Sequence, residues 1–214
     1  MFDAQKILQQ VLGGKQAGGM ISSDHVTGAA VGGLAGLLLG SKAARKMAGP
    51  VAQLGGVAAV GTLAYQAWQM WQAKQGGQTP AIPSTAEGTV FLPQNPTMRN
   101  DLSLMVLSAM IAAAKSDGHI DAAEQEKIFS KLDQDNFSAE EKAFFMDQLR
   151  RPLNVAELAA SAQTPEQAAE IYTASVLAIQ PDTPSEISYL NNLAIALKLD
   201  PGLRSNIDAV VKTG

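Results

Sequence analysis

Helix start signals recur through residues 99–214, and they constrain the fold more than any other feature of the sequence. Five of them place Ser, Thr, Asp or Asn three residues before Glu or Gln, the spacing of a capping box, in which each side chain bonds the other residue's backbone N–H. Proline follows three of the starts and suits the first helical position, where an N–H would have no helical partner. The predicted starting residues are Asp121, Ser138, Asn154, Thr164, Thr183 and Asp200. They predict about seven helices and no strand, so the fold class is all-α.

Residues 101–114 form the most apolar of these predicted helices. Their sequence, DLSLMVLSAMIAAA, is apolar almost all round a helix, which is typical of a helix that is covered on every side. At 1.5 Å per residue the segment reaches about 21 Å, short of the roughly 30 Å hydrocarbon core of a bilayer. We therefore expect a buried central helix.

The first half of the chain has a different composition. Residues 26–40 carry no charge and have a glycine at every fourth position: Gly28, Gly32, Gly36 and Gly40. Glycine destabilises a helix by about 1 kcal/mol relative to alanine, yet in lipid small residues let helix backbones approach closely. The spacing predicts a helix-packing face that meets residues 50–65 of the same chain or the same face of a second copy.

A second apolar run covers residues 47–65. As a helix it would reach about 28 Å, nearly enough to cross a bilayer. Tyr65, Trp68 and Trp71 follow at helical spacing, as aromatic side chains do at the headgroup level of a membrane. We therefore predict a glycine-rich, membrane-associated helical hairpin or single span over residues 26–74, followed by a small helical bundle.

Charge predicts the side of the membrane on which the second half lies. Residues 1–96 hold six basic and three acidic side chains, whereas residues 97–214 hold ten basic and seventeen acidic ones. Basic loops favour the cytoplasm, so the loop with Lys42, Arg45 and Lys46 places the acidic half on the opposite side. An acidic half also argues against nucleic-acid binding, which requires a basic surface.

Composition divides the chain into four segments. They are an N-terminal amphipathic segment, a glycine-rich apolar segment, a Pro/Gly linker and an acidic helical domain, at residues 1–25, 26–74, 75–98 and 99–214. The linker has no helical period and is rich in proline. Within it, the sequence TVFLP at residues 89–93 is expected to touch the domain as a short extended piece.

The stretch AAAKSDGHIDAAEQEKI, residues 112–128, joins an apolar helix to an Asp-Gly turn and a following glutamate. It resembles the tellurite-resistance TerB-like domains, which are all-α bundles. The order of glycine-rich half, proline linker and helical domain resembles bacterial inner-membrane proteins of the YebE type. These resemblances imply an inner-membrane location and a setting of envelope or metal stress. With that location, the basic loop at residues 42–46 places the acidic domain in the periplasm.

In TerB-like domains the acidic turns are associated with divalent cations, so the resemblance implies a site for a cation such as calcium. Residues 174–190 weakly repeat the same helix, aspartate turn and glutamate, and the implied ligands come from both units: Asp117, Asp121, Glu124, Asp182 and Glu186. The turn is not an EF-hand, because the twelfth position counted from Asp117 is Ile128, where a glutamate is required. Helix capping is the alternative explanation for Asp121, Glu124 and Glu186.

The residue content argues against an enzyme. The chain has no cysteine and two histidines, and it lacks the motifs of a zinc hydrolase, a catalytic triad or a phosphate-binding loop. We predict a non-enzymatic, membrane-anchored interaction or sensing protein that pairs with a second copy or a membrane protein. Two alternatives stay open: a soluble adaptor whose apolar N-terminal part packs on a protein partner, and a hydrolase that uses the acidic turns with a metal.

Overall fold

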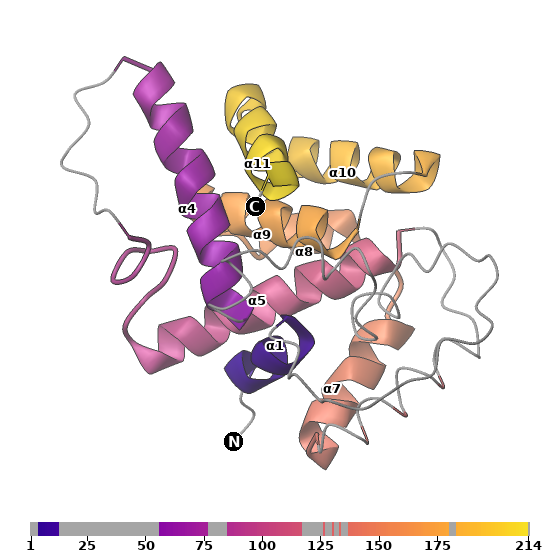
Figure 1. The fold of residues 1–214 in the computed structure, drawn as a ribbon. Coiled ribbons are helices and arrows are strands. Elements are labelled where there is room, and N and C mark those ends of the chain that lie inside the picture. The colour runs from indigo at the N-terminus through magenta and orange to yellow at the C-terminus, as the bar shows by residue number, and fades with distance from the viewer. Residues whose placement is uncertain are drawn as a thin grey trace, which may run out of the picture.

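A computed structural model describes residues 4–12, 56–76, 85–116, 137–179 and 183–213, together with positions 126, 130 and 133. Figure 1 shows that this part of the chain is a bundle of helices. Its helices are α1 (Ala4–Leu12), α4 (Gly56–Lys74), α5 (Pro96–Ala114), α7 (Ala139–Arg150), α8 (Val155–Ala160), α9 (Pro165–Ala178), α10 (Pro184–Ala196) and α11 (Pro201–Thr213). The described residues form no strand beyond one isolated bridge between Glu87 and Leu92. The all-α prediction is confirmed for this part of the chain.

Side chains start the helices as the sequence predicts. Five of the six predicted starting residues lie in the described part, and each accepts a hydrogen bond from the first turn of its helix: Ser138, Asn154, Thr164, Thr183 and Asp200. Ser138 and Thr183 form complete capping boxes with the glutamates three residues on. Local hydrogen bonds therefore decide where these helices begin.

Helix α5 begins earlier than predicted, inside the segment assigned to the linker. The side chain of Asn95 accepts hydrogen bonds from the N–H groups of Thr97 and Met98, at 2.9 and 3.2 Å, and Pro96 occupies the first helical position. The Asn-Pro pair is the same kind of signal as the two Thr-Pro starts. The capping-box pattern does not predict this helix start, because no Glu or Gln lies three residues after Asn95.

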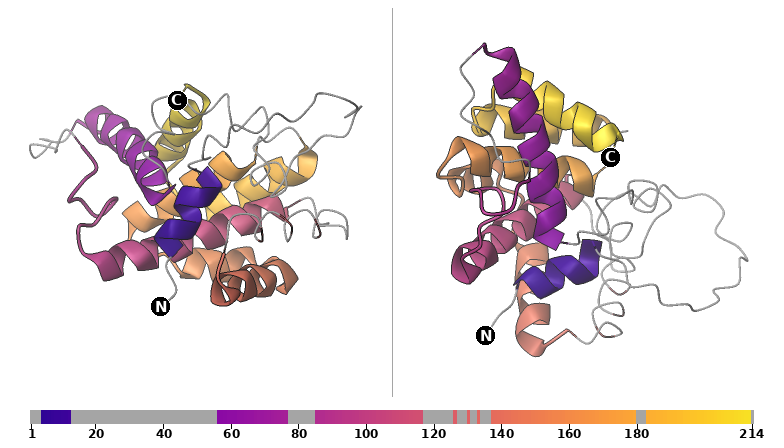
Figure 2. Two further views of the ribbon diagram at one scale, coloured as in Figure 1. Left: turned by 60° about the horizontal axis from the view of Figure 1, so that its bottom comes forward. Right: turned by 60° about the vertical axis from the view of Figure 1, so that its left-hand side comes forward.

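The centre of the bundle is the contact between α5 and α9. Val106 and Met110 of α5 and Ile171 and Tyr172 of α9 are fully buried. Figures 1 and 2 show α10 and α11 on one side of this pair and α1 and α7 on the other. Helix α4 contacts α1, α9 and α11, so it joins the two sides of the bundle.

The packing of α4 corrects part of the membrane prediction. Its first ten residues, 56–65, are the described part of the second apolar run, and Val60, Leu63 and Ala64 are buried in the core of the bundle. This part of the run is therefore covered by protein. No helix within the described ranges is long and apolar enough to cross a membrane.

The aromatic side chains of α4 also contact other parts of the same chain. The rings of Tyr65 and Trp68 lie with their centroids 5.6 and 5.8 Å from that of Phe91. The indole N–H of Trp71 donates to Asp200 Oδ1 at 2.8 Å. The prediction that these residues lie at the headgroup level of a membrane is corrected: the described part of the chain supplies the ring contacts of Tyr65 and Trp68 and the hydrogen-bond partner of Trp71.

Residues 85–95 fold back onto α4, and the TVFLP piece within them is mostly turn and bend rather than extended. Phe91 and Leu92 are buried in the core, and Gly88 adopts a φ of +79°, a turn conformation that favours glycine. The carbonyl oxygen of Phe91 lies so close to Gly61 of α4 that a Cβ at Gly61 would meet it at 2.2 Å. The glycine is required because it allows this contact between two backbones.

Replacing Gly61 with alanine tests this packing. On an open helix face the change should stabilise the helix by about 1 kcal/mol. Here the added Cβ collides with the Phe91 carbonyl, so we expect Gly61→Ala to lower the free energy of unfolding by about 1–3 kcal/mol, as overpacking does. Thermal and urea melts of the full chain measure the effect. Thr62→Ala, at the half-buried neighbouring position, is the control, and a Gly61→Ala variant more stable than wild type would contradict the packing.

Candidate functional site

A groove of about 620 Å³ runs along one face of α5 and is bounded by the α7–α8 connection, α8 and the start of α9. We call it the α5 groove. Its more buried lining is apolar and includes Leu102, Met105 and Ile111. Three of its lining residues are exposed large hydrophobic side chains: Val90, Met98 and Leu153, at 58, 55 and 39%. Apolar surface that would ordinarily be covered is therefore concentrated here.

The groove exists because α5 is covered on only part of its circumference. Helix α5 packs closely on α9 and α1 but touches α7 and α8 sparsely. Leu104, Met105 and Ala112 remain half-buried on the open side. The prediction of a central helix is confirmed for the face on α9, whereas the expectation that the helix is covered all round is wrong for the face on the groove.

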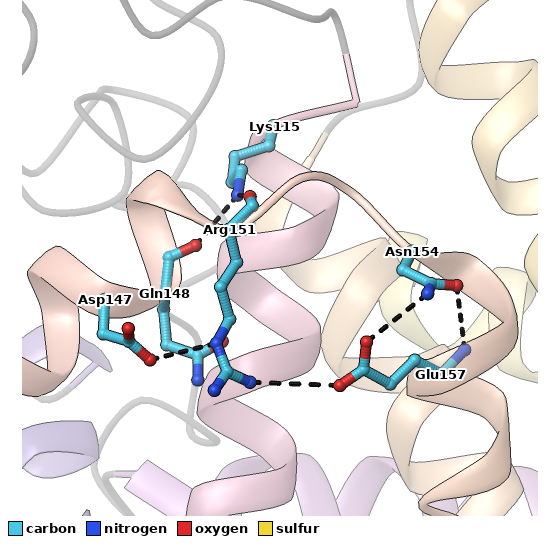
Figure 3. Close-up of polar contacts among 6 residues, drawn as sticks. All are labelled: Lys115, Asp147, Gln148, Arg151, Asn154 and Glu157. Carbon is cyan, nitrogen blue, oxygen red and sulfur yellow. Dashed lines mark hydrogen bonds and ion pairs between the residues drawn. The ribbon is translucent and has the colours of Figure 1, made fainter.

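Lys115 closes the groove at the C-terminal end of α5 (Figure 3). Its Nζ donates to the carbonyl oxygen of Gln148 at 2.8 Å and to that of Arg151. These carbonyls lie at the C-terminal end of α7, where a helix has unpaired acceptors and partial negative charge. Burial lowers the pKa of Lys115. The lysine thus fixes the end of α7 to the end of α5.

Arg151 and Glu157 form the polar rim at the same end (Figure 3). The Arg151 guanidinium lies 3.0 Å from Asp147 Oδ2 and 3.9 Å from Glu157 Oε1. Asn154 caps α8 by accepting from the Glu157 N–H at 3.1 Å. These pairs are exposed, so they contribute little to stability; they hold charged groups at one end of an apolar groove.

The described lining of the groove is apolar on its floor and polar at its rim. No described histidine lines it, and two of its hydroxyls are occupied in helix ends, since Thr164 caps α9 and Ser161 donates to the Leu158 carbonyl. An apolar floor, adaptable methionines and a polar rim are the features with which proteins bind the apolar face of a helix.

Most of the residues predicted to hold a metal or to pack helices lie outside the described residues. These are Asp117, Asp121, Glu124 and Asp182, and the glycines Gly28, Gly32, Gly36 and Gly40. Glu186 is described: its Oε2 accepts from the Thr183 N–H at 3.1 Å and from the Thr183 hydroxyl at 3.0 Å. It therefore fills the capping role that was the alternative to a metal ligand.

Acidic side chains do not cluster as a metal site in the described part of the chain. Within those residues no group of three or more Asp, Glu, His or Cys side chains is arranged to hold a metal ion. Cation binding by the full set of five carboxylates stays a prediction.

Glu170 is a candidate functional residue that the sequence reasoning missed. Its side chain lies on α9 and is fully buried, and neither carboxylate oxygen has a hydrogen-bond partner within the described part. A Cβ on Gly61 would lie 3.6 Å from its Oε1, so the carboxyl faces α4. Burial raises the pKa of Glu170 well above its ordinary value, and the charge of Glu166 adds to the shift.

A signal for this residue is present in the sequence. Glu170 is the single charged residue in AAEIYTASVLA, residues 168–178, and it follows Glu166 by one helical turn. Two like charges at this spacing destabilise a helix unless one is neutral. A lone charge within a largely apolar run is therefore the pattern that predicts a buried carboxyl.

The raised pKa predicts how stability depends on pH. Because the folded state holds this proton more tightly than the unfolded state, the contribution of Glu170 is fully present below its ordinary pKa of 4.5 and is lost as pH rises through the folded-state pKa. Between the unfolded-state and folded-state pKa values, the free energy of unfolding falls by up to about 1.4 kcal/mol per pH unit. Glu170→Gln removes the titratable carboxyl. We therefore expect the melting temperature of the variant, relative to that of wild type, to rise steadily between pH 4.5 and 8.

The control for this experiment is the same change at an exposed glutamate, Glu140→Gln. A buried amide has its own desolvation penalty, which shifts the Glu170→Gln curve by a constant amount. The pH dependence of the difference is therefore the measurement. Identical pH profiles for the two variants would show that Glu170 is not buried as a neutral acid.

Comparison with known proteins adds a family but no activity. A family model described as "Protein of unknown function (DUF533)" matches residues 24–211. A Yersinia enterocolitica protein described as "Uncharacterized protein in ampR 5'region" is 30% identical over 107 residues, which cover 50% of this chain and 77% of that protein. No solved structure matches the chain. These matches show neither a TerB-like domain nor a protein of the YebE type.

Proposed function

This chain belongs to the DUF533 family of proteins of unknown function, and we propose that it is a non-enzymatic interaction protein whose α5 groove binds an amphipathic helix of a partner protein. One observation carries the proposal: α5 is apolar almost all round, yet the face on the groove stays half-exposed between Met98 and Lys115. A helix of this composition is ordinarily buried on all sides, so a partner that covers the open face is the expected complement.

The length of the groove suits a helix. Its lining residues on α5 extend from Met98 to Lys115, which corresponds to about 26 Å or roughly five helical turns. Met98 and Met105 adapt their shape to a partner's side chains, as flexible thioethers do at helix-binding surfaces. The partner's apolar residues would recur every three or four positions.

Charge favours one orientation of the partner helix. Asp101 lies at one end of the groove, and the two cations Lys115 and Arg151 lie with the single carboxylate of Glu157 at the other. A helix has partial positive charge at its N-terminus and partial negative charge at its C-terminus. The bound helix would therefore run parallel to α5, with its N-terminus near Asp101.

A photo-crosslinking amino acid at position 98 tests the groove in living cells. Met98 is exposed, so the replacement leaves the core intact. We expect adducts that mass spectrometry maps to the apolar face of an amphipathic helix in another protein. Adding Met105→Glu should abolish them, because it places a charge on the groove floor, and a melt of the purified variant establishes that it still folds.

Position 195 gives the matched control. Ile195 is 75% exposed on α10 and lies outside the groove, so the same crosslinker there should give none of these adducts. Identical adducts from both positions, adducts to lipid, or adducts within the same chain would each contradict the proposal.

Membrane anchoring is the second part of the proposed function. With residues 56–65 packed in the bundle, anchoring rests on residues 26–40 and the adjoining basic loop, and an inner-membrane location with a periplasmic bundle follows from that loop. Self-association through the glycine face, a divalent-cation site and the TerB-like or YebE-type resemblance are further proposals that rest mainly on residues outside the described part. The soluble adaptor is the alternative.

Fractionation of the full chain tests the anchor. We expect the protein in the membrane fraction, resistant to alkaline carbonate and released by detergent. A double variant, Leu38→Arg with Leu39→Arg, should move it to the soluble fraction, since each arginine disfavours insertion by about 2.5–3.5 kcal/mol. Recovery of the unchanged chain from the soluble fraction without detergent would overturn the anchor and favour the adaptor.

A further inference from the structure

A second cavity, of about 760 Å³, lies on the opposite side of α8 from the α5 groove, between α8, the tryptophans of α4 and the connection from α10 to α11. We propose that this cavity, the tryptophan pocket, binds a small amphiphile with an apolar body and one carboxylate, and that Lys198 is the residue that recognises the carboxylate. The inference goes beyond the proposed function, because it concerns a different ligand at a different site.

The apolar body of the ligand follows from the walls. One wall is made of Trp68 and Trp71, whose ring centroids lie 5.1 Å apart. The facing wall consists mainly of alanines from α8 and the residues after it, including Ala156, Ala159 and Ala162. The indole rings are half-buried, and they line the same cavity as these alanines, so apolar surface stays unfilled. Its volume lies in the range of ligand pockets, about 300–1,000 Å³.

One tryptophan is held in place before any ligand binds. Trp71 Nε1 donates to Asp200 Oδ1 at 2.8 Å, and the same oxygen accepts from the N–H groups of Gly202 and Leu203 at 2.8 and 3.2 Å. The indole ring is therefore fixed in a position that forms the pocket wall. Fixing a binding group in advance reduces the entropy lost on binding.

Of the two charged described residues that line the pocket, Asp200 and Lys198, the positive one has a free charged group. Asp200 Oδ1 already accepts three hydrogen bonds, two of them from the first turn of α11, which stabilise its carboxylate without cancelling its charge. The Lys198 side chain is exposed and has no hydrogen bond or ion pair with another described residue. An anionic group is the ligand chemistry that would complete this site.

The backbone of Lys198 supports a functional role for its side chain. Its φ is +53°, and Lys198 is the one non-glycine residue with positive φ among the described residues. The Lys198 and Leu199 N–H groups donate to the Ile195 and Ala194 carbonyls, each at 3.0 Å, in the arrangement that ends many helices and normally has glycine at this position. A lysine here is disfavoured for the backbone, and the ammonium group that it places at the pocket gives a reason for a side chain at this position.

Both tryptophans of the chain line the pocket, so their fluorescence reports binding directly. The full chain is titrated with decanoate below its micelle concentration, with uncharged decanol, and with decyltrimethylammonium. We expect a saturable change in emission with decanoate and decanol and none with the cation. Lys198→Met should weaken decanoate binding about tenfold, the effect of losing one charge-assisted contact, and leave decanol binding unchanged.

Two further variants separate ligand recognition from folding. Lys198→Gly should weaken decanoate binding to the same extent while raising the melting temperature by a few degrees, because glycine fits the positive φ. Ala196→Phe, at an exposed lining position, should fill the pocket and prevent binding of both decanoate and decanol. Lys212→Met, an exposed lysine that does not line the pocket, is the control and should bind as wild type.

Three results would overturn the proposal. They are the absence of saturable emission change, decanoate binding unaffected by Lys198→Met, and binding of decyltrimethylammonium as tight as that of decanoate. Equal weakening by Lys198→Met and Lys212→Met would also overturn it, because a general charge effect would then explain the result.

Discussion

The structure depends on the burial of α9 against α5. Ten of the fourteen residues of α9 are buried, so the helix has almost no surface on which to place a polar group. The buried hydroxyls of Thr173 and Ser175 find hydrogen-bond partners within α9 itself. They donate to the carbonyls four residues earlier, at 2.7 and 2.9 Å. A glutamate cannot do the same, since an ionised carboxylate only accepts hydrogen bonds. Burial in this helix, followed by the charge of Glu166, raises the pKa of Glu170.

Helix α4 shows how one apolar sequence serves two environments. Its first half is part of a run that is apolar enough to suit lipid, yet it covers α9 and α11 and brings Gly61 against the Phe91 carbonyl. Periodicity does not distinguish these outcomes, because an apolar helix face is buried equally well by a protein core or by acyl chains. What distinguishes them is a set of contacts with residues far along the chain, such as Trp71 with Asp200 and Lys74 with Asn206.

Helix α8 separates the α5 groove from the tryptophan pocket. It has six residues and none of them is buried, and its alanines leave space toward α4 while Leu158 and Glu157 line the side toward α5. A short helix of small residues is thus a thin partition between two cavities. Ligands of different kinds at the two sites would contact opposite faces of the same element, so α8 is the element through which the sites would influence each other.

The sequence by itself determined the fold class and most helix starts of this protein. Ser138 with Glu141 and Thr183 with Glu186 form the predicted capping boxes, because a cap joins atoms three residues apart and needs nothing from the rest of the chain. Glu186 was predicted both as a metal ligand and as a cap, and its described contacts are those of a cap. Tertiary structure alone decided which apolar faces meet: that α4 packs on the bundle, that one face of α5 stays open, and that Lys198 and Trp71 border one pocket. These outcomes depend on contacts between residues distant in sequence, and the residue pattern specifies that an apolar face must be buried without specifying what buries it.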